Sequence, residues 1–146
     1  VPEAYYFDLI NYAIESGKVD AVDIEYFRSR ESIEKTLAVA KAHSVTVVMS
    51  NHDFDKTPSF DEITERLIGM KKIGADVAKL ACMPNSAKDV LTLLSATEAV
   101  KSQYPDEPII TMSMGKLGAV SRISGEIFGS ALTFGSAKKS IGSGPD

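Results

Sequence analysis

The chain has 146 residues, of which 44% are hydrophobic and 25% are charged. This composition is typical of soluble globular proteins, and the length is enough for one domain with its own core. The formal net charge of −4 offers no basic surface to nucleic acid or to an anionic membrane. The sequence therefore argues against nucleic-acid-binding and membrane-surface proteins.

Cys82 is the one cysteine of the chain, so it has no partner for an internal disulfide and cannot form a thiolate metal site alone. No apolar run approaches the roughly 20 residues that cross a bilayer, and the first residues show no signal-peptide pattern. We therefore expect the chain in the cytosol. It starts inside a helical unit and stops in an open loop at residues 141–146, so we expect both ends to be cut.

Short β-branched runs alternate with longer amphipathic stretches, which indicates alternating strands and helices. In chain order we expect a helix (3–16), a strand (19–27), a helix (32–42), a strand (45–50), a helix between Ser59 and Gly74, a strand (75–83), a helix (86–103), a strand (108–114), a helix (119–128) and a strand (131–134).

The helix boundaries carry recognisable cap residues. Gly17 and Gly74 are candidate C-terminal caps, and Ser32 lies near the start of its helix. Ser59 followed by Glu62 three residues later forms a capping-box pattern.

This alternation implies parallel strands joined by right-handed helical crossovers. Two architectures have that order, an open doubly wound sheet and a (β/α)8 TIM barrel. A complete barrel needs about 250 residues, so five strands are little more than half of one. No Gly-x-Gly-x-x-Gly run follows the first strand and no Walker-type loop is present, which weakens the nucleotide-binding alternatives.

Reactive groups of parallel α/β folds gather at the carboxyl ends of the strands. Asp23 and Glu25 lie in the first expected strand, His52 comes just after the second, and Lys79 lies inside the third. Residues 112–116 lie at the end of the fourth expected strand. These polar residues are the candidates for chemistry.

Lys79 has apolar neighbours on both sides, as in a buried strand. Desolvation there would favour the neutral amine, which can add to a ketone and form an imine. The alternative is an edge-strand lysine whose stem packs on apolar surface while its head reaches water.

His52 carries the side chain best suited to proton transfer near neutral pH, although a loop histidine more often makes a structural hydrogen bond. His43 lies at a helix C-terminus, where a cation complements the helix dipole, and receives no role. His52 has no second histidine or cysteine at ligand spacing, so a metal site is poorly supported.

Arg122 follows the fourth strand and has the chemistry to bind a substrate carboxylate; the alternative is a surface pair with Glu126 four residues on. Met112 and Met114 share one face of their strand and either line a pocket or fill a core. The lysines at 138–139 are expected to be solvated or to lie near a loop mouth.

Four runs of the chain resemble the type I 3-dehydroquinate dehydratases in order and with few gaps. They are residues 48–58 (VMSNHDFDKTP), 75–84 (ADVAKLACMP), 108–116 (PIITMSMGK) and 121–130 (SRISGEIFGS). The first resembles the histidine-bearing segment of that family and the second its Schiff-base lysine strand. The resemblance covers essentially the whole chain.

The resemblance implies a (β/α)8 barrel of which residues 1–146 are a single C-terminal portion, carrying strands four to eight. It implies a lyase that dehydrates 3-dehydroquinate to 3-dehydroshikimate in the shikimate pathway of aromatic amino acid biosynthesis. Lys79 would form the Schiff base and His52 would donate and accept protons. The substrate would be bound by Arg122, Met112, Met114 and Phe134. No metal or organic cofactor is implied, because the imine supplies the electron sink.

Two departures from the family pattern bear on activity. The glutamate that orients the family's histidine is expected upstream of Val1. Residues 140–146 (SIGSGPD) stand where the family has its Ser-Ala-Pro-Gly-Gln lid loop, so that lid is not recognisable. Ser140 and Ser143 are weak candidates for the lid serine.

Missing strands would leave sheet edges open, so we expect a homodimer or a second chain that supplies them. One alternative is a catalytically incomplete half-barrel that acts only as a folding or assembly module. Another is a Schiff-base aldolase, against which the Asn-His-Asp-Phe and Met-Ser-Met runs argue.

Overall fold

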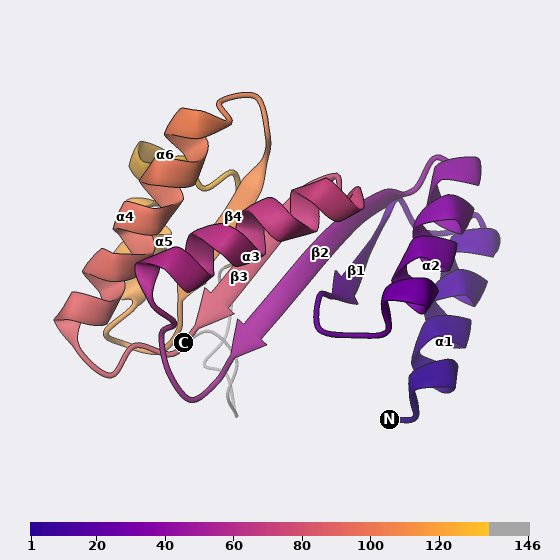
Figure 1. Cartoon of the computed structure of the whole chain (residues 1–146), viewed down its shortest axis with the longest axis horizontal. Helices are drawn as coiled ribbons and strands as arrows, with labels where there is room; N and C mark the ends of the chain where they lie inside the picture. The colour runs from indigo at the N-terminus through magenta and orange to yellow at the C-terminus, as the bar shows by residue number, and fades with distance from the viewer. Residues whose placement is uncertain (135–146) are drawn as a thin grey trace.

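The computed structural model of the chain describes residues 1–134 (Figure 1). Helices and strands alternate as far as the fourth strand, after which two short helices follow. The elements are α1 (Glu3–Glu15), β1 (Ala21–Glu25), α2 (Arg30–Ala42), β2 (Thr46–Asp53), α3 (Phe60–Ile73), β3 (Val77–Cys82), α4 (Ala87–Gln103), β4 (Ile109–Ser113), α5 (Ala119–Ile123) and α6 (Gly125–Phe128).

Within the described residues, the strands form one parallel sheet in the order β1-β2-β3-β4, so each strand lies beside its neighbour in sequence (Figure 1). The predicted α/β alternation and parallel pairing are confirmed. The register sets Glu25 opposite Ser50, Ser50 opposite Lys79 and Lys79 opposite Ile110. This register decides which side chains meet across the sheet.

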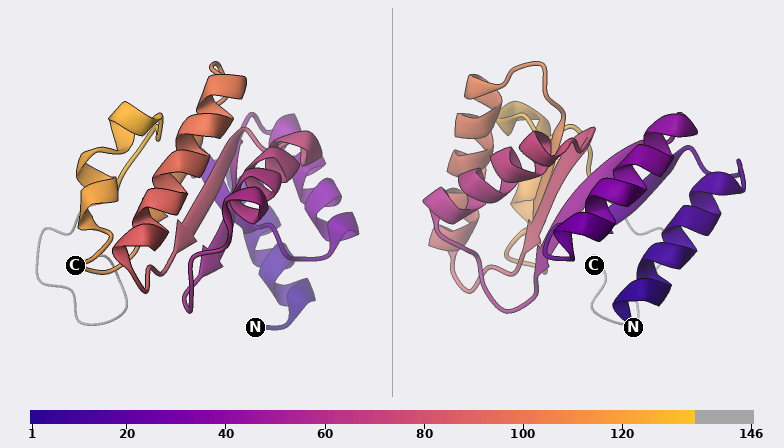
Figure 2. Two further views of the ribbon diagram at one scale, coloured as in Figure 1. Left: turned by 60° about the vertical axis from the view of Figure 1, so that its left-hand side comes forward. Right: turned by 45° about the vertical axis from the view of Figure 1, so that its right-hand side comes forward.

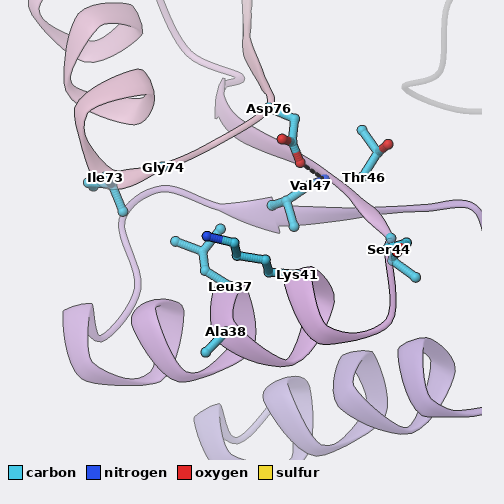
Figure 3. A pocket seen from close by; sticks show the side chains of 10 residues that line it. Leu37, Ala38, Lys41, Ser44, Thr46, Val47, Ile73, Gly74 and Asp76 are labelled. Atoms are coloured by element: carbon cyan, nitrogen blue, oxygen red, sulfur yellow. Dashed lines mark hydrogen bonds between the residues drawn. The ribbon is translucent and has the colours of Figure 1, made fainter.

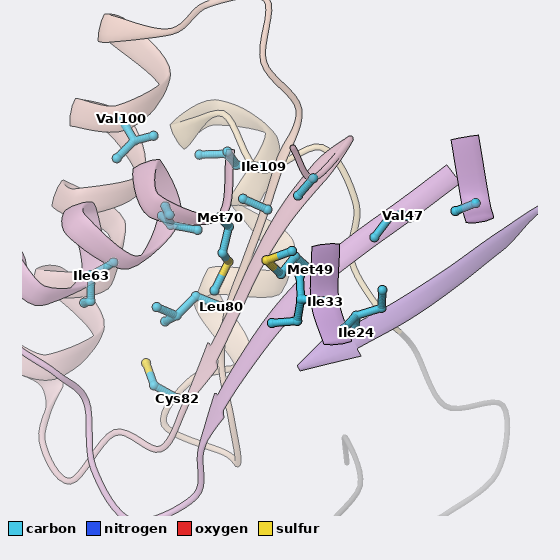
Figure 4. Close-up of a cluster of buried hydrophobic side chains, with 14 of the residues drawn as sticks. Ile24, Ile33, Val47, Met49, Ile63, Met70, Leu80, Cys82, Val100 and Ile109 are labelled. Carbon is cyan, nitrogen blue, oxygen red and sulfur yellow. The ribbon is translucent and has the colours of Figure 1, made fainter. Parts of the chain in front are cut away.

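The apolar core lies between the helices and one face of the sheet (Figure 4). Alternate strand residues point to opposite faces, and those facing the helices are almost fully buried. They include Ile24, Met49, Leu80 and Ile109, which pack with helix residues such as Ile33, Ile63, Leu67, Met70 and Leu93. Each such side chain stabilises the fold by about 1.5–3 kcal/mol.

The other set of alternate residues defines a second face, which we call the polar face. It carries Asp23 and Glu25 from β1, Ser50 and His52 from β2, and Lys79 from β3. A small buried apolar cluster of Ala81, Ile110, Met112 and Met114 continues it toward β4. The sequence alternation therefore separates a hydrophobic core from a face that holds the candidate chemistry.

Cap residues fix the ends of the longer helices. Ser59 and Glu62 form the predicted capping box at the start of α3, and Gly74 ends that helix with a left-handed φ of 115°. Because a residue with a Cβ is disfavoured at this φ, glycine suits the position. Figure 2 shows α3 and α4 side by side, and their residues contact each other.

Helix α2 begins slightly earlier than predicted. Its N-cap is Ser29, whose side chain accepts a hydrogen bond from the backbone N–H of Ser32. The helix therefore starts at Arg30 rather than at Ser32.

Strand β2 is longer than predicted, because its pairing with β3 continues through Asn51↔Leu80 and His52↔Ala81 to Asp53. His52 thus lies inside a strand and not in the loop that follows. The cross-strand hydrogen bonds with β3 outweigh the loop-forming tendency of the Asn-His-Asp run.

The predicted helix over residues 119–128 is two short helices, α5 and α6, separated at Ser124. The Ser124 hydroxyl donates to the backbone carbonyl of Val120, a local bond that competes with helix continuation. Gly129 then ends α6 with a left-handed φ of 93°.

The strand predicted over residues 131–134 is wrong as far as the described residues go. Ser130 forms an isolated parallel bridge with Ile109, and the N–H of Ala131 donates to the carbonyl of Ile109. Within residues 1–134 pairing with β4 stops there, so this part of the sheet has four strands and one bridge instead of five strands.

Among the helices of residues 1–134, none combines the length and the apolar character required to span a membrane.

Candidate active site

Lys79 lies on the polar face with its side chain only 11% exposed. Its Nζ donates a hydrogen bond of 2.8 Å to Oδ2 of Asp23, which is 42% exposed. The fully buried Ser50 donates its hydroxyl to the other oxygen of the same carboxylate, Oδ1. Three neighbouring strands thus contribute one residue each to a single hydrogen-bonded chain.

His52 and Glu25 form a second pair on the same face, at the carboxyl ends of β2 and β1. Nδ1 of His52 lies 2.5 Å from Oε1 of Glu25. Because an ionised carboxylate only accepts hydrogen bonds, this contact places the proton on Nδ1 and leaves Nε2 for proton exchange with a ligand.

Glu25 thereby corrects one expectation from the sequence. A glutamate that orients His52 was expected upstream of Val1, yet the structure supplies one from β1, two residues after Asp23. The register explains this result, since β1 and β2 are parallel neighbours and Glu25 lies opposite Ser50, two residues before His52.

Tyr6 supports the Glu25 position from α1, because its phenol oxygen accepts a 2.9 Å hydrogen bond from the backbone N–H of Glu25. Burial, with the Glu25 carboxylate adding to it, raises the pKa of the Tyr6 phenol above its ordinary value. The phenol therefore stays neutral beside the site.

An aromatic ring lies beside His52 and another beside Lys79, and two methionines lie further along the same face. The ring of Phe54 stacks on His52 at a centroid distance of 5.9 Å, and Nζ of Lys79 lies 5.3 Å from the centroid of the Phe134 ring. Met112 and Met114 are buried in the cluster beside Ala81, which follows Lys79 by two residues on the same face. The structure brings Phe134 to Lys79 and sets the two methionines along the same face.

Arg122 lies in α5, and its guanidinium Nε is buried without a hydrogen-bond partner among the described residues. The side chain lines a cavity of about 460 Å³ with Ser130 and Thr133. Within residues 1–134 no ion pair joins Arg122 to Glu126, so the surface pair considered from the sequence does not form. Among the described residues, Nε of Arg122 is therefore a buried donor without an acceptor.

Cys82 belongs to the helix side of β3 and is fully buried. Burial raises the pKa of its thiol to about 11, so the thiol stays protonated and unreactive at neutral pH. In the part of the chain that the structure describes, no three His, Cys, Asp or Glu side chains converge to hold a metal ion.

A cavity of about 570 Å³ lies far from this chemistry, between α2 and α3 (Figure 3). Its lining includes Lys41 from α2, together with Thr46 and Asp76 at the amino ends of β2 and β3. The Asp76 carboxylate already accepts a 2.7 Å hydrogen bond from the N–H of Val47. Since ligands of parallel α/β folds bind at the carboxyl ends of strands, we regard this cavity as structural.

Sequence reasoning singled out Lys79, His52, Asp23 and Glu25 but missed which of them pair, and it missed Ser50. A signal was present, because Asp23 and Glu25 have the same spacing of two as Ser50 and His52. Residues two apart share a face of a strand, so neighbouring strands bring the two sets together. Ser140, Ser143 and the lysines at 138–139 lie outside the described residues.

The fold and the site define the class of protein. The chain is a parallel α/β protein whose sheet presents a lysine–aspartate pair beside a histidine–glutamate pair, groups suited to amine and acid–base chemistry.

Comparison with known proteins gives the family. A family model described as type I 3-dehydroquinase matches residues 1–146. The chain is 50% identical over 139 residues to the 3-dehydroquinate dehydratase of Salmonella typhimurium, and 51% identical over 144 residues to that of Listeria welshimeri. These alignments cover 95% and 99% of this chain. The chain therefore belongs to the type I 3-dehydroquinase family.

A solved structure agrees with the sequence relatives. The crystal structure of the type I 3-dehydroquinate dehydratase of Clostridium difficile with covalently modified comenic acid matches 99% of this chain with a TM-score of 0.94 and 47% identity. The match covers 57% of that protein, and the sequence relatives are covered to 55% and 57% of their length. This chain thus spans little more than half the length of the proteins it resembles.

Proposed function

We propose that this chain carries the imine-forming centre of a 3-dehydroquinate dehydratase, a lyase of the shikimate pathway that leads to the aromatic amino acids. The observation that supports it most is the position of Lys79, which is almost buried on the polar face and lies opposite Ser50, two residues before His52 on the neighbouring strand. Membership in the type I 3-dehydroquinase family supports the same reaction.

The first chemical step uses Lys79. Its neutral amine adds to the ketone of 3-dehydroquinate, and loss of water gives an imine. Once protonated, the imine draws electrons from the neighbouring carbon and lowers the barrier to removing that carbon's proton. The imine is the electron sink, so the proposal needs no metal or organic cofactor.

The elimination step uses His52. Nε2 takes the carbon-bound proton, and the resulting imidazolium then gives a proton to the departing hydroxyl, which leaves as water. Glu25 stabilises that imidazolium through Nδ1. Hydrolysis of the imine by water releases 3-dehydroshikimate and restores the Lys79 amine, so one water is lost overall.

Substrate binding is assigned to Arg122 and to the apolar side chains. The guanidinium of Arg122 is suited to the ring carboxylate, since it can donate two parallel hydrogen bonds to one carboxylate. Within residues 1–134 its Nε has no hydrogen-bond partner. Met112, Met114 and Phe134 would form the apolar wall of the pocket. They lie along the face that carries Lys79.

The sheet of this chain is proposed to be one section of a (β/α)8 barrel, with residues 1–146 forming a single domain of it. Further strands would complete the barrel, either from the same polypeptide or from a second chain in a homodimer or a complementing pair. The reaction would take place in the cytoplasm.

Borohydride trapping tests the proposal. The chain is incubated with 3-dehydroquinate, reduced with borohydride and digested. The mass of the peptide that contains Lys79 is then measured by mass spectrometry. We expect a covalent adduct on this peptide and its loss in Lys79→Ala. Lys88→Ala, at an exposed lysine of α4, is the matched control and should keep the adduct. A chain that shows no adduct on Lys79 would contradict the proposal.

A further inference from the structure

Lys79 is paired with an aspartate and not with the histidine. Among the described residues, the recorded partners of its Nζ are Oδ2 of Asp23 at 2.8 Å and the ring of Phe134. His52 is held separately by Glu25. The amine and the proton-transfer group thus have different carboxylates, which implies different tasks for Asp23 and Glu25.

Ser50 fixes the direction of the Asp23 carboxylate. It lies on β2, between β1 and β3, and is fully buried. Its hydroxyl donates to Oδ1, so Oδ2 remains for Lys79. An Asp23 side chain that is 42% exposed would otherwise rotate toward water, because surface carboxylates gain little from a single ion pair.

The negative charge of Asp23 acts on the Lys79 nitrogen twice, first in the free protein and again after the nitrogen has formed an imine. In the free protein the negative charge favours the ammonium, which has no lone pair for attack. After the imine forms, the same charge favours the protonated imine, and only the protonated form is a strong electron sink. One carboxylate therefore slows the first step and assists the second.

We propose that Asp23 is the counter-ion of the Lys79 nitrogen through the reaction, holding it as ammonium before the substrate binds and as protonated imine afterwards, with Ser50 as the positioning residue for Asp23. The second half of this proposal rests on the proposed function, whereas the first half concerns the free protein alone. The two halves can therefore be tested separately.

The first test needs no substrate. Lys79 is labelled with a trace of acetic anhydride across a pH series, and mass spectrometry compares its peptide with that of the exposed Lys88 as internal reference. In Asp23→Asn the carboxylate charge is gone, so we expect Lys79 to be labelled about tenfold faster near pH 8. Asp20→Asn removes an exposed carboxylate just before β1 and should leave the labelling unchanged.

Ser50→Ala is the second variant. Without its hydroxyl the carboxylate loses its orientation, and labelling of Lys79 should rise by a few-fold, less than in Asp23→Asn. If Asp23→Asn does not fold, as judged by circular dichroism, Ser50→Ala decides the question alone. Labelling that is unchanged in the folded variants would overturn the counter-ion proposal, whatever the chain does with 3-dehydroquinate.

The second test measures the imine. Cyanoborohydride reduces protonated imines preferentially, so the yield of trapped adduct on Lys79 reports how much of the imine is protonated. We expect Asp23→Asn to give several-fold less adduct than the unsubstituted chain although its amine is labelled faster. Equal or higher trapping in the variant would overturn the second half. If the unsubstituted chain gives no adduct, the proposed function fails and the first test still stands.

Discussion

Glu25 holds one nitrogen of His52, so the nitrogen that remains for catalysis depends on a single carboxylate. In Glu25→Gln the charge that stabilises the imidazolium is lost, and the amide can turn either its oxygen or its nitrogen toward Nδ1. By analogy with other carboxylate–histidine pairs, we expect the dehydration rate to fall by at least about tenfold. The appearance of dehydroshikimate absorbance measures this rate.

The same variant should keep the Lys79 adduct after borohydride reduction, because Glu25 pairs with His52 whereas Lys79 pairs with Asp23. Glu34→Gln serves as the control, since Glu34 pairs with Arg30 on the exposed side of α2. A Glu25→Gln chain that dehydrates as fast as the unsubstituted chain would show that Glu25 has no part in the reaction.

Single residues were predictable where a local rule applies and not where distant strands meet. Lys79 and His52 stand out because reactive groups collect at the carboxyl ends of parallel strands. The Lys79–Asp23 bond joins residues 56 positions apart, and the register that creates it is set by the pairing of three strands. The spacing of two between Ser50 and His52 matches that between Asp23 and Glu25, but it points to a contact with Asp23 only when the register of β1 and β2 is known.

The capping box of α3 gives the clearest prediction for a single helix. Ser59 accepts from the N–H of Glu62, and the Glu62 side chain accepts from the N–H of Ser59. Ser59→Ala should lower the free energy of unfolding by about 1 kcal/mol. The N–H of Glu62 loses its acceptor, and the hydrogen bond from the N–H of residue 59 to the Glu62 side chain loses the support of the cap. Urea titration followed by circular dichroism measures the change.

Ser95→Ala provides the matched control, because Ser95 is exposed in the middle of α4 and alanine favours helix. Its unfolding midpoint should stay the same or rise slightly. A Ser59→Ala midpoint equal to that of the unsubstituted chain would mean that the cap does not support α3.

The boundaries of helices with clear cap residues and a clear hydrophobic periodicity were predicted well. The boundaries of elements without these features were not. The Ser59 and Gly74 boundaries of α3 follow the sequence. The extension of β2 to His52 and the break at Ser124 depend on hydrogen bonds to β3 and to Val120. The strand expected over residues 131–134 rested on four residues, too few for a periodic signal to be decisive.

At the scale of the whole molecule, the sheet edges are the feature to test. Within the described residues β1 pairs only with β2, and β4 meets β3 and the single bridge at Ser130. Unpaired strand edges promote pairing with other chains. We therefore predict that the chain associates with itself at micromolar concentration, which sedimentation velocity over a dilution series measures. A monodisperse, cooperatively melting monomer at every dilution would contradict this prediction.

The family and the α/β class were predictable from the sequence because several motifs occur in order over the whole chain. That the sheet is one section of a (β/α)8 barrel stays a prediction, since the described residues form a single sheet of four parallel strands. The two ion pairs of the polar face could not be predicted, because which residues meet depends on the register of the parallel strands.

The mass of the adduct trapped on Lys79 tests the central claim most directly, because an adduct reduced after dehydration is lighter by one water than one reduced before it. For the unsubstituted chain with 3-dehydroquinate, we predict the lighter adduct on the Lys79 peptide. For His52→Ala, which keeps the amine but lacks the proton-transfer group, we predict the heavier one. The absence of any Lys79 adduct, or an equally fast appearance of the lighter adduct in His52→Ala, would contradict the assignment of imine chemistry to Lys79 and proton transfer to His52.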